Sequence, residues 1–561
     1  MALGSQSTQA HGPKGHGDNS TKASSEEDPV PIAPADTPLT AGDARQQIDL
    51  DWSRLDLTTI MPRDSPLRVL IQPKVEAVTV SAYGGKSRLN NWVEVEVAGA
   101  PKESYLTKLF AMAATEEHVG CCVTHHDTRF IMYFNVEHAD DHLVLRNRSE
   151  HLIYATPLDD GKTEKVETWA PIELTLGEWV ISTSDEPLVE VKVLERTHWP
   201  ISPSLSTKRP AEGTAVLPKK TRAAPHLGGA REETLEALAS TNDLLTLRRG
   251  ERVHVGAGEN SYKLKHLAII SDHQFTRVCR AEHSKVLGKL VAIKIIKTAN
   301  AGEDATVRAA EAWMHETNIL SSLSGSHFAV AQYFGSDARF HSIYTEYIDA
   351  KPLIDYRDSN CRFDGNTVRA WRILGDMAAG LAFVHAHNVV HADIKLFNIL
   401  FSPVRGAVLV DFSVSFIQGS PIRSYGAPWY LPPECLNRST SRDKTSDMWA
   451  LGVVMMWVLG RIPMPERTRD WNVRDLHPTG PPQECNVRAK VRMSEWLNLV
   501  LEAKVISTEQ AGEIQEIVNG LVEKKQNDRT DAAMLEQQIV ASNLHQPSDT
   551  LITSHQSNGL F

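Results

Sequence analysis

The stretch "VVHADIKLFNIL" (389–400) decides the fold of the C-terminal half of the chain. It places Asp393, Lys395 and Asn398 close together between apolar residues. Two β-branched residues lead into the stretch, and a second apolar run, "AVLVDF" (407–412), follows it. Both flanks are typical of strands, so the sequence predicts a polar loop bracketed by strands. Two questions arise: which chemistry needs these three side chains, and why an alanine, Ala392, precedes the aspartate.

The composition limits the class of protein. With 561 residues the chain is long enough for two to four domains. Its net charge of −11 gives no basic field, so nucleic acid is not expected as a partner. The six cysteines include no Cys-x-x-Cys pair, which favours a reducing compartment without structural zinc. The longest apolar run, "WALGVVMMWVLG" (449–460), is shorter than the roughly 20 residues of a membrane span. The N-terminus has no apolar stretch, so no signal peptide is expected. We therefore expect a soluble intracellular protein without membrane contact.

The texture of the sequence changes several times and predicts five segments. Residues 1–66 are rich in small and polar residues, and we predict that they are disordered, as is the tail 544–561. Residues 67–196 contain short β-branched and aromatic runs between turn signals, which predict an antiparallel β-sandwich or barrel. Residues 197–240 have no period and are predicted to be a linker. Strand-like runs followed by long helical patterns predict an α+β domain at 263–543.

Two short stretches leave alternatives open. "CCVTHH" (121–126) could be a metal cluster, but it is interpreted more simply as a β-strand. In the linker, "KRPAEGTAVLPKKTR" (208–222) carries two basic clusters nine residues apart. This spacing resembles a bipartite nuclear import signal, although a solvated run of charge is the alternative. The resemblance implies a nuclear or nucleocytoplasmic location, and without it a cytoplasmic one.

Further motifs follow in a fixed order around the opening stretch. They are "VAIK" (291–294), "HETNILSSL" (315–323), "HADIKLFN" (391–398), "DFS" (411–413), "GAPWYLPPE" (426–434), "SDMWALG" (446–452) and "NDRT" (527–530). In this order they resemble the eukaryotic protein kinase family over roughly residues 263–543. The resemblance implies a multidomain chain, in which an α+β two-lobed kinase fold follows an all-β sandwich-like domain.

The resemblance also implies roles for six polar residues and two cofactors, ATP and Mg²⁺. Lys294 is expected to hold the phosphates of ATP and to pair with Glu316. Asp411 and Asn398 are expected to bind magnesium, because hard cations prefer oxygen ligands. Asp393 would accept or orient the proton of the acceptor hydroxyl, and Lys395 would face the γ-phosphate.

Other positions are placed by the same resemblance. Val278 and Ala292 would form the roof over adenine, and the backbones of Glu346 and Ile348 would meet its edge, with Thr345 beside them as the gatekeeper. The remaining expectations are structural: His391 packs against Phe412, Glu434 pairs with Arg529, and Asp447 ties the catalytic loop to the buried helix 447–460.

Four departures from the family pattern bear on activity. The stretch "ISDHQFTRV" (270–278) places Ser271, His273 and Thr276 at the three glycine positions of the phosphate loop. Glycine there allows the backbone to approach phosphates closely, so its loss should weaken the grip on the nucleotide. Ser413 replaces a hinge glycine, and Ala427 replaces a threonine near the catalytic aspartate.

The fourth departure is Ala392, at the position where the family usually has an arginine. That arginine pairs with a phosphorylated activation segment and takes no part in the transfer itself. Besides Ser413, the segment between Asp411 and Glu434 carries Ser415, Ser420 and Ser424, which are its candidate sites for phosphate. We therefore expect a serine/threonine protein kinase, acting on protein substrates, that is not switched by phosphate on this segment. The alternative is a pseudokinase that binds nucleotide or partners without efficient transfer.

The β domain carries a weaker signal. "LVLRNRSEHLIYA" (143–155), together with the strand-like runs up to residue 194, resembles the closing strands of a forkhead-associated domain, in a degenerate form. Such domains bind phosphothreonine, and "KSRL" (86–89) offers Ser87 and Arg88 without a matching histidine. The alternative is a generic β-sandwich that docks a partner.

Overall fold

The computed structural model describes residues 67–195 and 242–544, apart from 85–91, 97–107, 137–140, 257–260, 299–301, 421–425, 437–441, 478–480, 482 and 506–511. Every described residue belongs to the unit 53–561. The expected disordered segment 1–66, the basic clusters at 208–222 and the tail 545–561 lie outside the described residues.

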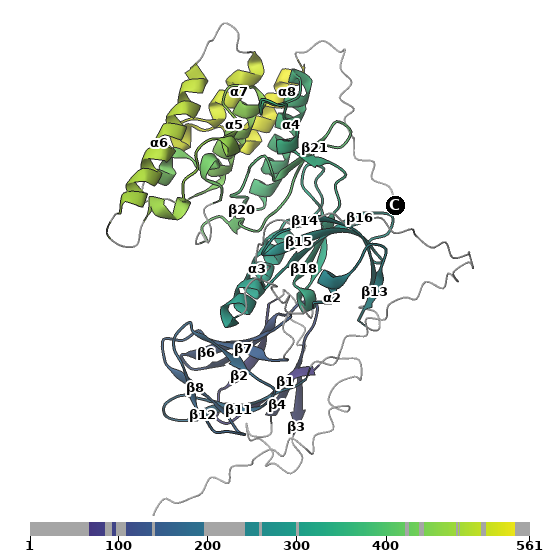
Figure 1. The fold of residues 1–561 in the computed structure, drawn as a ribbon, viewed down its shortest axis with the longest axis vertical. Helices are drawn as coiled ribbons and strands as arrows, with labels where there is room; N and C mark the ends of the chain where they lie inside the picture. Colours follow the sequence, from purple (N-terminus) through teal and green to yellow (C-terminus); the bar gives the residue numbers. More distant parts are fainter. Residues whose placement is uncertain are drawn as a thin grey trace, which may run out of the picture. The chain divides into compact units, whose positions relative to one another are not determined.

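The first described region, 67–195, is built from two antiparallel sheets (Figure 1). One sheet has the order β3-β4-β1-β12-β11-β8-β9 and the other the order β10-β7-β6-β5-β2. The bounds are β1 Leu67–Pro73, β2 Thr79–Tyr83, β3 Trp92–Glu96, β4 Lys108–Ala113, β5 Gly120–His125, β6 Thr128–Phe134, β7 Leu143–Asn147, β8 Ile153–Pro157, β9 Glu164–Val166, β10 Pro171–Leu174, β11 Gly177–Ser182 and β12 Pro187–Val193.

Alternation along the strands builds the core of this sandwich. In β6, Phe130 and Met132 are buried in the cluster that joins the two sheets, together with Val69 and Val191 of the facing sheet. Successive side chains of a strand point to opposite faces, so every second residue enters this core. "CCVTH" lies in strand β5, in which Cys121 belongs to the same core, so the strand interpretation describes this stretch.

The second region begins with a six-stranded antiparallel sheet of order β13-β14-β15-β16-β18-β17. β13 (Arg252–Val255) pairs with β14 (Tyr262–Asp272), so the sheet begins ahead of residue 263, where the sequence predicts the start of the domain. The short helix α2 (Asp243–Thr246) contributes Leu244 to the apolar cluster of this sheet. The other elements are β15 Thr276–His283, β16 Leu290–Ile296, the 20-residue helix α3 Glu303–Ser322, β17 Tyr333–Asp337 and β18 Ser342–Glu346.

Helices follow the sheet, as the pattern of the sequence predicts. α4, α5, α7 and α8 lie side by side in Figure 1, with α6 next to them. α5 is buried over almost its whole length, which explains the apolar run 449–460 as a core helix. In the described part of the chain, no helix combines the length and apolar character needed to cross a bilayer. The bounds are α4 Thr367–Ala386, α5 Lys444–Val458, α6 Glu484–Val505, α7 Glu513–Leu521 and α8 Ala532–Leu544.

Candidate active site

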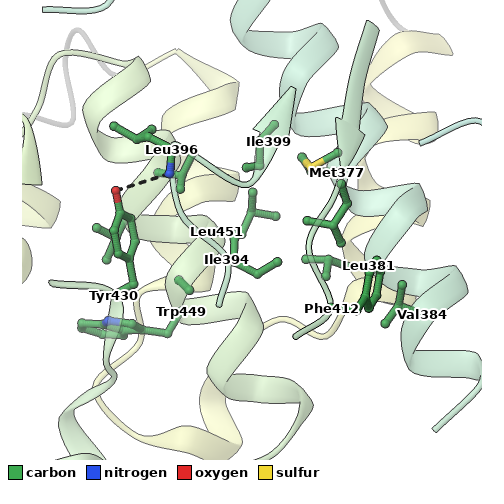
Figure 2. Close-up of a cluster of buried hydrophobic side chains, with 14 of the residues drawn as sticks. Met377, Leu381, Val384, Ile394, Leu396, Ile399, Phe412, Tyr430, Trp449 and Leu451 are labelled. Atoms are coloured by element: carbon green, nitrogen blue, oxygen red, sulfur yellow. Dashed lines mark hydrogen bonds between the residues drawn. The ribbon is translucent and has the colours of Figure 1, made fainter. Parts of the chain in front are cut away.

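Short strand pairs hold the loop 391–398. β20 (Val389–Val390) pairs with β23 (Phe416–Ile417), and β21 (Ile399–Ser402) pairs with β22 (Gly406–Leu409). Ile394 and Leu396 are fully buried between the polar residues of the loop. Figure 2 shows Ile394 beside Leu451 and Leu396 beside Tyr430, whose hydroxyl accepts from the backbone N–H of Leu396. The apolar residues therefore anchor the loop in the helical core and leave its polar residues for the site.

Asp393 is the centre of a hydrogen-bonded group. Its Oδ2 accepts from Lys395 Nζ at 2.6 Å and from Asn398 Nδ2 at 2.9 Å. Its Oδ1 accepts from the backbone N–H of Ala427 at 3.3 Å, so the backbone contributes at the position where the family has a threonine side chain. The carboxylate is thus oriented from three sides, as a group that must meet one hydroxyl in a fixed geometry requires.

A second group joins the strand sheet to the loop that follows β22. Lys294 Nζ of β16 lies 2.8 Å from a carboxylate oxygen of Glu316 on α3 and 2.7 Å from Oδ1 of Asp411. Burial alone would lower the pKa of Lys294, but the two carboxylates raise it above its usual value. Burial also opposes the ionisation of Asp411, yet the ammonium of Lys294 holds its pKa well below the usual range. A fixed cation and a fixed carboxylate therefore share this site.

The donor set of the site suits a hard divalent cation. Asp411 supplies carboxylate oxygens, and Asn398 uses its amide nitrogen to donate to Asp393, which leaves the amide oxygen as its donor to a metal. Oxygen-only ligands of this kind match magnesium, which usually binds through one or two carboxylates and the phosphates of a substrate. The expected ligands Asn398 and Asp411 therefore fit the ion that the sequence predicts.

The residues expected around adenine lie on neighbouring strands. Val278 of β15 is the register partner of Lys294 on β16, and both are half-buried, as is Ala292 two residues earlier. Cys279 and Ile293, the alternate residues of the same strands, are buried on the other face of the sheet. The N–H of Glu346, at the end of β18, donates to the carbonyl of Gln332. The backbone of Ile348 follows two residues later.

The turn between β14 and β15 replaces the glycine-rich loop. Its backbone closes through a hydrogen bond from His273 N to Thr276 O at 2.8 Å, and Phe275 at its tip is exposed. Asp272 accepts from Arg277 at 2.7 Å and from Lys297, and these bonds lower its pKa to about 2. The turn is thus held by charged side chains where the family pattern has glycines.

Two residues at the start of α5 hold the backbone of Ala392: Asp447 in the first turn and Arg442 just before the N-cap. Its N–H donates to Asp447 Oδ1 at 2.8 Å, and its carbonyl accepts from the guanidinium of Arg442 at 2.6 Å. Ala392 has a φ of 65°, a conformation that residues other than glycine adopt only under constraint. Its side chain packs in a small apolar cluster with Val390 and Phe416.

Arg442 supports the loop that carries Asp393, but it belongs to none of the sequence motifs. It is almost fully buried, and it stands directly before Asp443, the N-cap of α5. The sequence signal is only "SRDKTSD" (441–447), which predicts a helix start and gives no hint of a contact with residue 392. Arg442 thus supports the backbone of residue 392 from a position 50 residues later in the chain.

Replacing Arg442 with alanine is expected to lower the free energy of unfolding by about 1.5–3 kcal/mol, because a buried charged hydrogen bond is lost. Urea unfolding of the full chain measures this change. Arg442→Lys should lose less, and Arg488→Ala, which removes an exposed pair with Glu484, should change stability by less than about 0.5 kcal/mol. If Arg442→Ala were as stable as the unmodified chain, the hydrogen bond from Arg442 to the Ala392 carbonyl would not stabilise the fold.

The supporting contacts expected from the motifs are also present. Arg529 forms a bidentate pair with Glu434 at 2.7 and 2.6 Å, and His391 packs edge-on against Phe412 with ring centroids 4.8 Å apart. Asp447 accepts from the backbone N–H groups of His391 and Ala392, both at 2.8 Å. Each of these pairs joins segments far apart in the sequence and fixes the loop that carries Asp393.

Of the three candidate sites for phosphate, Ser415 and Ser420 lie among the described residues. Ser415 is fully buried, and its hydroxyl donates to the carbonyl of His391 at 2.9 Å, so it is no accessible site for phosphate. Ser420 is exposed, and Ser424 lies outside the described residues, as do Ile422 and Tyr425. Phe416, which we expect to order the segment by packing, is buried beside Val390.

Comparison with known proteins matches residues 268–540 to the model of the protein kinase domain. Among curated proteins, the chain is 29% identical to the mitogen-activated protein kinase kinase kinase YODA of Arabidopsis thaliana over 175 residues, which are 30% of this chain and 19% of that protein. It is 36% identical to the serine/threonine-protein kinase GRIK1 of the same plant over 134 residues, or 23% of this chain and 33% of that protein. It is 24% identical to the NUAK family SNF1-like kinase 2 of Rattus norvegicus over 304 residues, or 51% and 46%. The chain thus spans less than half the length of each of these relatives.

Proposed function

Because residues 268–540 belong to the protein kinase family, we propose that this chain transfers the γ-phosphate of ATP to serine and threonine hydroxyls of protein substrates. One observation carries the proposal. Lys294 contacts both Glu316 and Asp411, while Asp393, Lys395 and Asn398 form a second hydrogen-bonded group. A binding module has no chemical need for both groups.

Each group would serve one part of phosphoryl transfer, which depends on positioning and on neutralising charge. Lys294 would bind the phosphates of ATP, held in place by Glu316. Asp411 and Asn398 would hold magnesium, which supplies positive charge to the phosphates. Asp393 would orient the acceptor hydroxyl and take its proton, with Lys395 beside it to meet the negative charge of the transferred group.

The test is a transfer assay on the full chain with magnesium and ATP, using a library of peptides that contain serine, threonine or tyrosine as the acceptor. Phosphate on serine and threonine, and its absence when magnesium is chelated, is the expected result. Labelling of tyrosine alone would contradict the proposed acceptor class.

A pseudokinase is the second candidate, and the turn at 273–275 favours it. Charged contacts of Asp272 with Arg277 and Lys297 hold a turn that lacks the glycines which allow close approach to phosphates. ATP that raises the melting temperature without any transfer would support this reading, since a ligand that binds only the folded state raises apparent stability.

Independence from phosphate on the activation segment is part of the proposal. Treatment with phosphatase, or replacement of Ser420 and Ser424 by alanine, is expected to change turnover by less than about tenfold, or ~1.4 kcal/mol. The reason is that Ala392 offers no guanidinium to a phosphate. Ser415 is left unchanged in this variant, because its buried hydroxyl bonds to His391. Activity that disappears with phosphatase and returns on rephosphorylation would contradict this prediction.

We also propose that the basic clusters of the linker direct the chain to the nucleus. Replacing Lys219, Lys220 and Arg222 with alanine is expected to move a fluorescent fusion of the full chain from the nucleus to the cytoplasm. The reason is that a bipartite signal needs both basic clusters to bind along the acidic groove of an import receptor. Imaging of the unmodified and the substituted fusion tests the proposal. An unmodified fusion that is evenly distributed between nucleus and cytoplasm would count against nuclear import.

For the β-sandwich we propose a docking role, with the forkhead-associated resemblance as one form of it. The first strand, β1, pairs with the last strand, β12, and the two sheets share one apolar core, so the region is built as one β-sandwich. Ser87 and Arg88, the residues that would meet a phosphothreonine, lie outside the described residues.

A further inference from the structure

The sheet β10-β7-β6-β5-β2 is apolar on both faces. Phe130 and Met132 of β6 enter the core of the sandwich, whereas Ile131 and Tyr133, on the opposite face, are also fully buried. The same holds in β7, where Leu143 and Leu145 face the core and Val144 does not. A sheet with one solvated face alternates apolar and polar residues, so this pattern requires a cover on the second face.

Helix α3 provides that cover. Val307, Ala310 and Trp313 of α3 belong to the same buried cluster as Ile131 and Tyr133. α3 contacts β6, β7 and β10, and Val307 and Ala310 are completely buried. The apolar core of the kinase domain therefore continues through α3 into the outer face of the sandwich sheet.

Polar groups fix the register of this contact. The hydroxyl of Tyr133 donates to Glu311 Oε1 at 3.0 Å, and Arg148 donates to the Tyr133 hydroxyl at 3.0 Å and forms an ion pair with Glu311. A backbone hydrogen bond of 2.9 Å joins Ala338 N to Glu116 O nearby. Burial raises the pKa of Tyr133, so its hydroxyl stays protonated as a donor.

Helix α3 links this contact to Glu316, the partner of Lys294. Glu311 and Glu316 lie five residues apart on the same continuous helix, so a constraint on Glu311 is expected to limit the directions available to Glu316. His315, the neighbour of Glu316, contacts the carbonyl of Ser415 in the activation segment at 2.7 Å. Ala392 stands where the family has an arginine that pairs with a phosphorylated activation segment. Another contact must therefore hold α3 in position.

We propose that the outer face of α3 is a docking surface whose occupant is the β-sandwich of the same chain, and that this contact holds Glu316 against Lys294. The inference rests on the proposed kinase activity for its functional consequence, but the contact itself can be measured without that activity. The sandwich is thus a resident activator of the catalytic domain, in the role that a phosphorylated segment plays elsewhere in the family.

A charge swap in the full chain tests the proposal. Arg148→Glu and Glu311→Arg each place like charges together, and each is expected to reduce transfer about tenfold or more and to increase deuterium exchange over 303–322. The double variant restores the pair in reverse, so activity should return to within about threefold of the unmodified chain. The matched control is Arg146→Glu, because Arg146 also lies over Trp169 but has no contact with Glu311, and it should leave activity unchanged.

The outcomes separate this inference from the proposed function. An unmodified chain without any transfer defeats the proposed function, and the exchange of α3 then decides the contact alone. Single variants with normal exchange over 303–322 would overturn the contact. Single variants with raised exchange and full activity would overturn the role of the sandwich as an activator. A double variant that folds, with an unchanged melting temperature, but recovers neither exchange nor activity would overturn the pairing of Arg148 with Glu311.

Discussion

Lys294→Met is expected to reduce phosphoryl transfer by about 100-fold or more, a loss of at least ~2.7 kcal/mol in barrier stabilisation. The variant removes the cation that joins Glu316 and Asp411 and that would meet the phosphates. Glu316 is almost fully buried, so it would be left without its partner and would take up a proton. Initial rates at saturating ATP, together with the shift in melting temperature on adding magnesium and ATP, measure the effect. Both are expected to fall.

The control for this variant is Lys289→Met. Lys289 precedes β16, is exposed, and lies against Gln332 and Phe334, away from the two carboxylates. Its loss should leave the rate unchanged. Normal turnover in Lys294→Met would mean that the nucleotide site lies elsewhere in the chain.

Asp393→Asn should separate chemistry from binding. The amide cannot take the proton of the acceptor, so transfer is expected to fall by about 10²–10⁴-fold. Lys294 and Asp411, which we propose to bind the phosphates and magnesium, are unchanged, so magnesium and ATP should still raise the melting temperature. The exposed Asp355, which pairs with Arg357, gives the control variant Asp355→Asn, and its rate should match that of the unmodified chain.

A different pattern would change the interpretation of Asp393. If Asp393→Asn loses both transfer and the thermal shift, the carboxylate serves mainly to hold Lys395 and Asn398 in place. If transfer persists, the catalytic base is another group, and the assignment of this loop is wrong.

The sequence alone determined the parts of the site that depend on local spacing. A strand that ends in Lys294, a loop that carries Asp393 and Asn398, and the Asp-Phe-Ser that follows are each local patterns. Their order along the chain identifies the kinase domain, and residues 268–540 match its family model. The β-rich region at 67–195 could be predicted as well, because short alternating runs report strands without any knowledge of their partners.

Only the tertiary structure decided which distant residues meet. The support for Ala392 comes from Arg442, which stands 50 positions later on a helix start that has no motif. Ser415 is buried and its hydroxyl donates to the carbonyl of His391, which removes one of the three candidate phosphate sites. Strand β13 precedes all the motifs in the sequence, yet it joins the kinase sheet. Its pairing with β14 appears only in the folded sheet.

The sandwich illustrates the physical reason. In "RFIMYF" (129–134), apolar residues occupy both the odd and the even positions. The sequence therefore indicates a strand that is buried on both faces. The sequence cannot say that the second face meets α3. Hydrophobic burial is non-directional and proportional to area, so an apolar face does not specify which element covers it. That choice depends on the burial of Val307 and Ala310 in one cluster with Ile131, and on the pairing of Arg148 and Tyr133 with Glu311. Both exist only once the chain has folded.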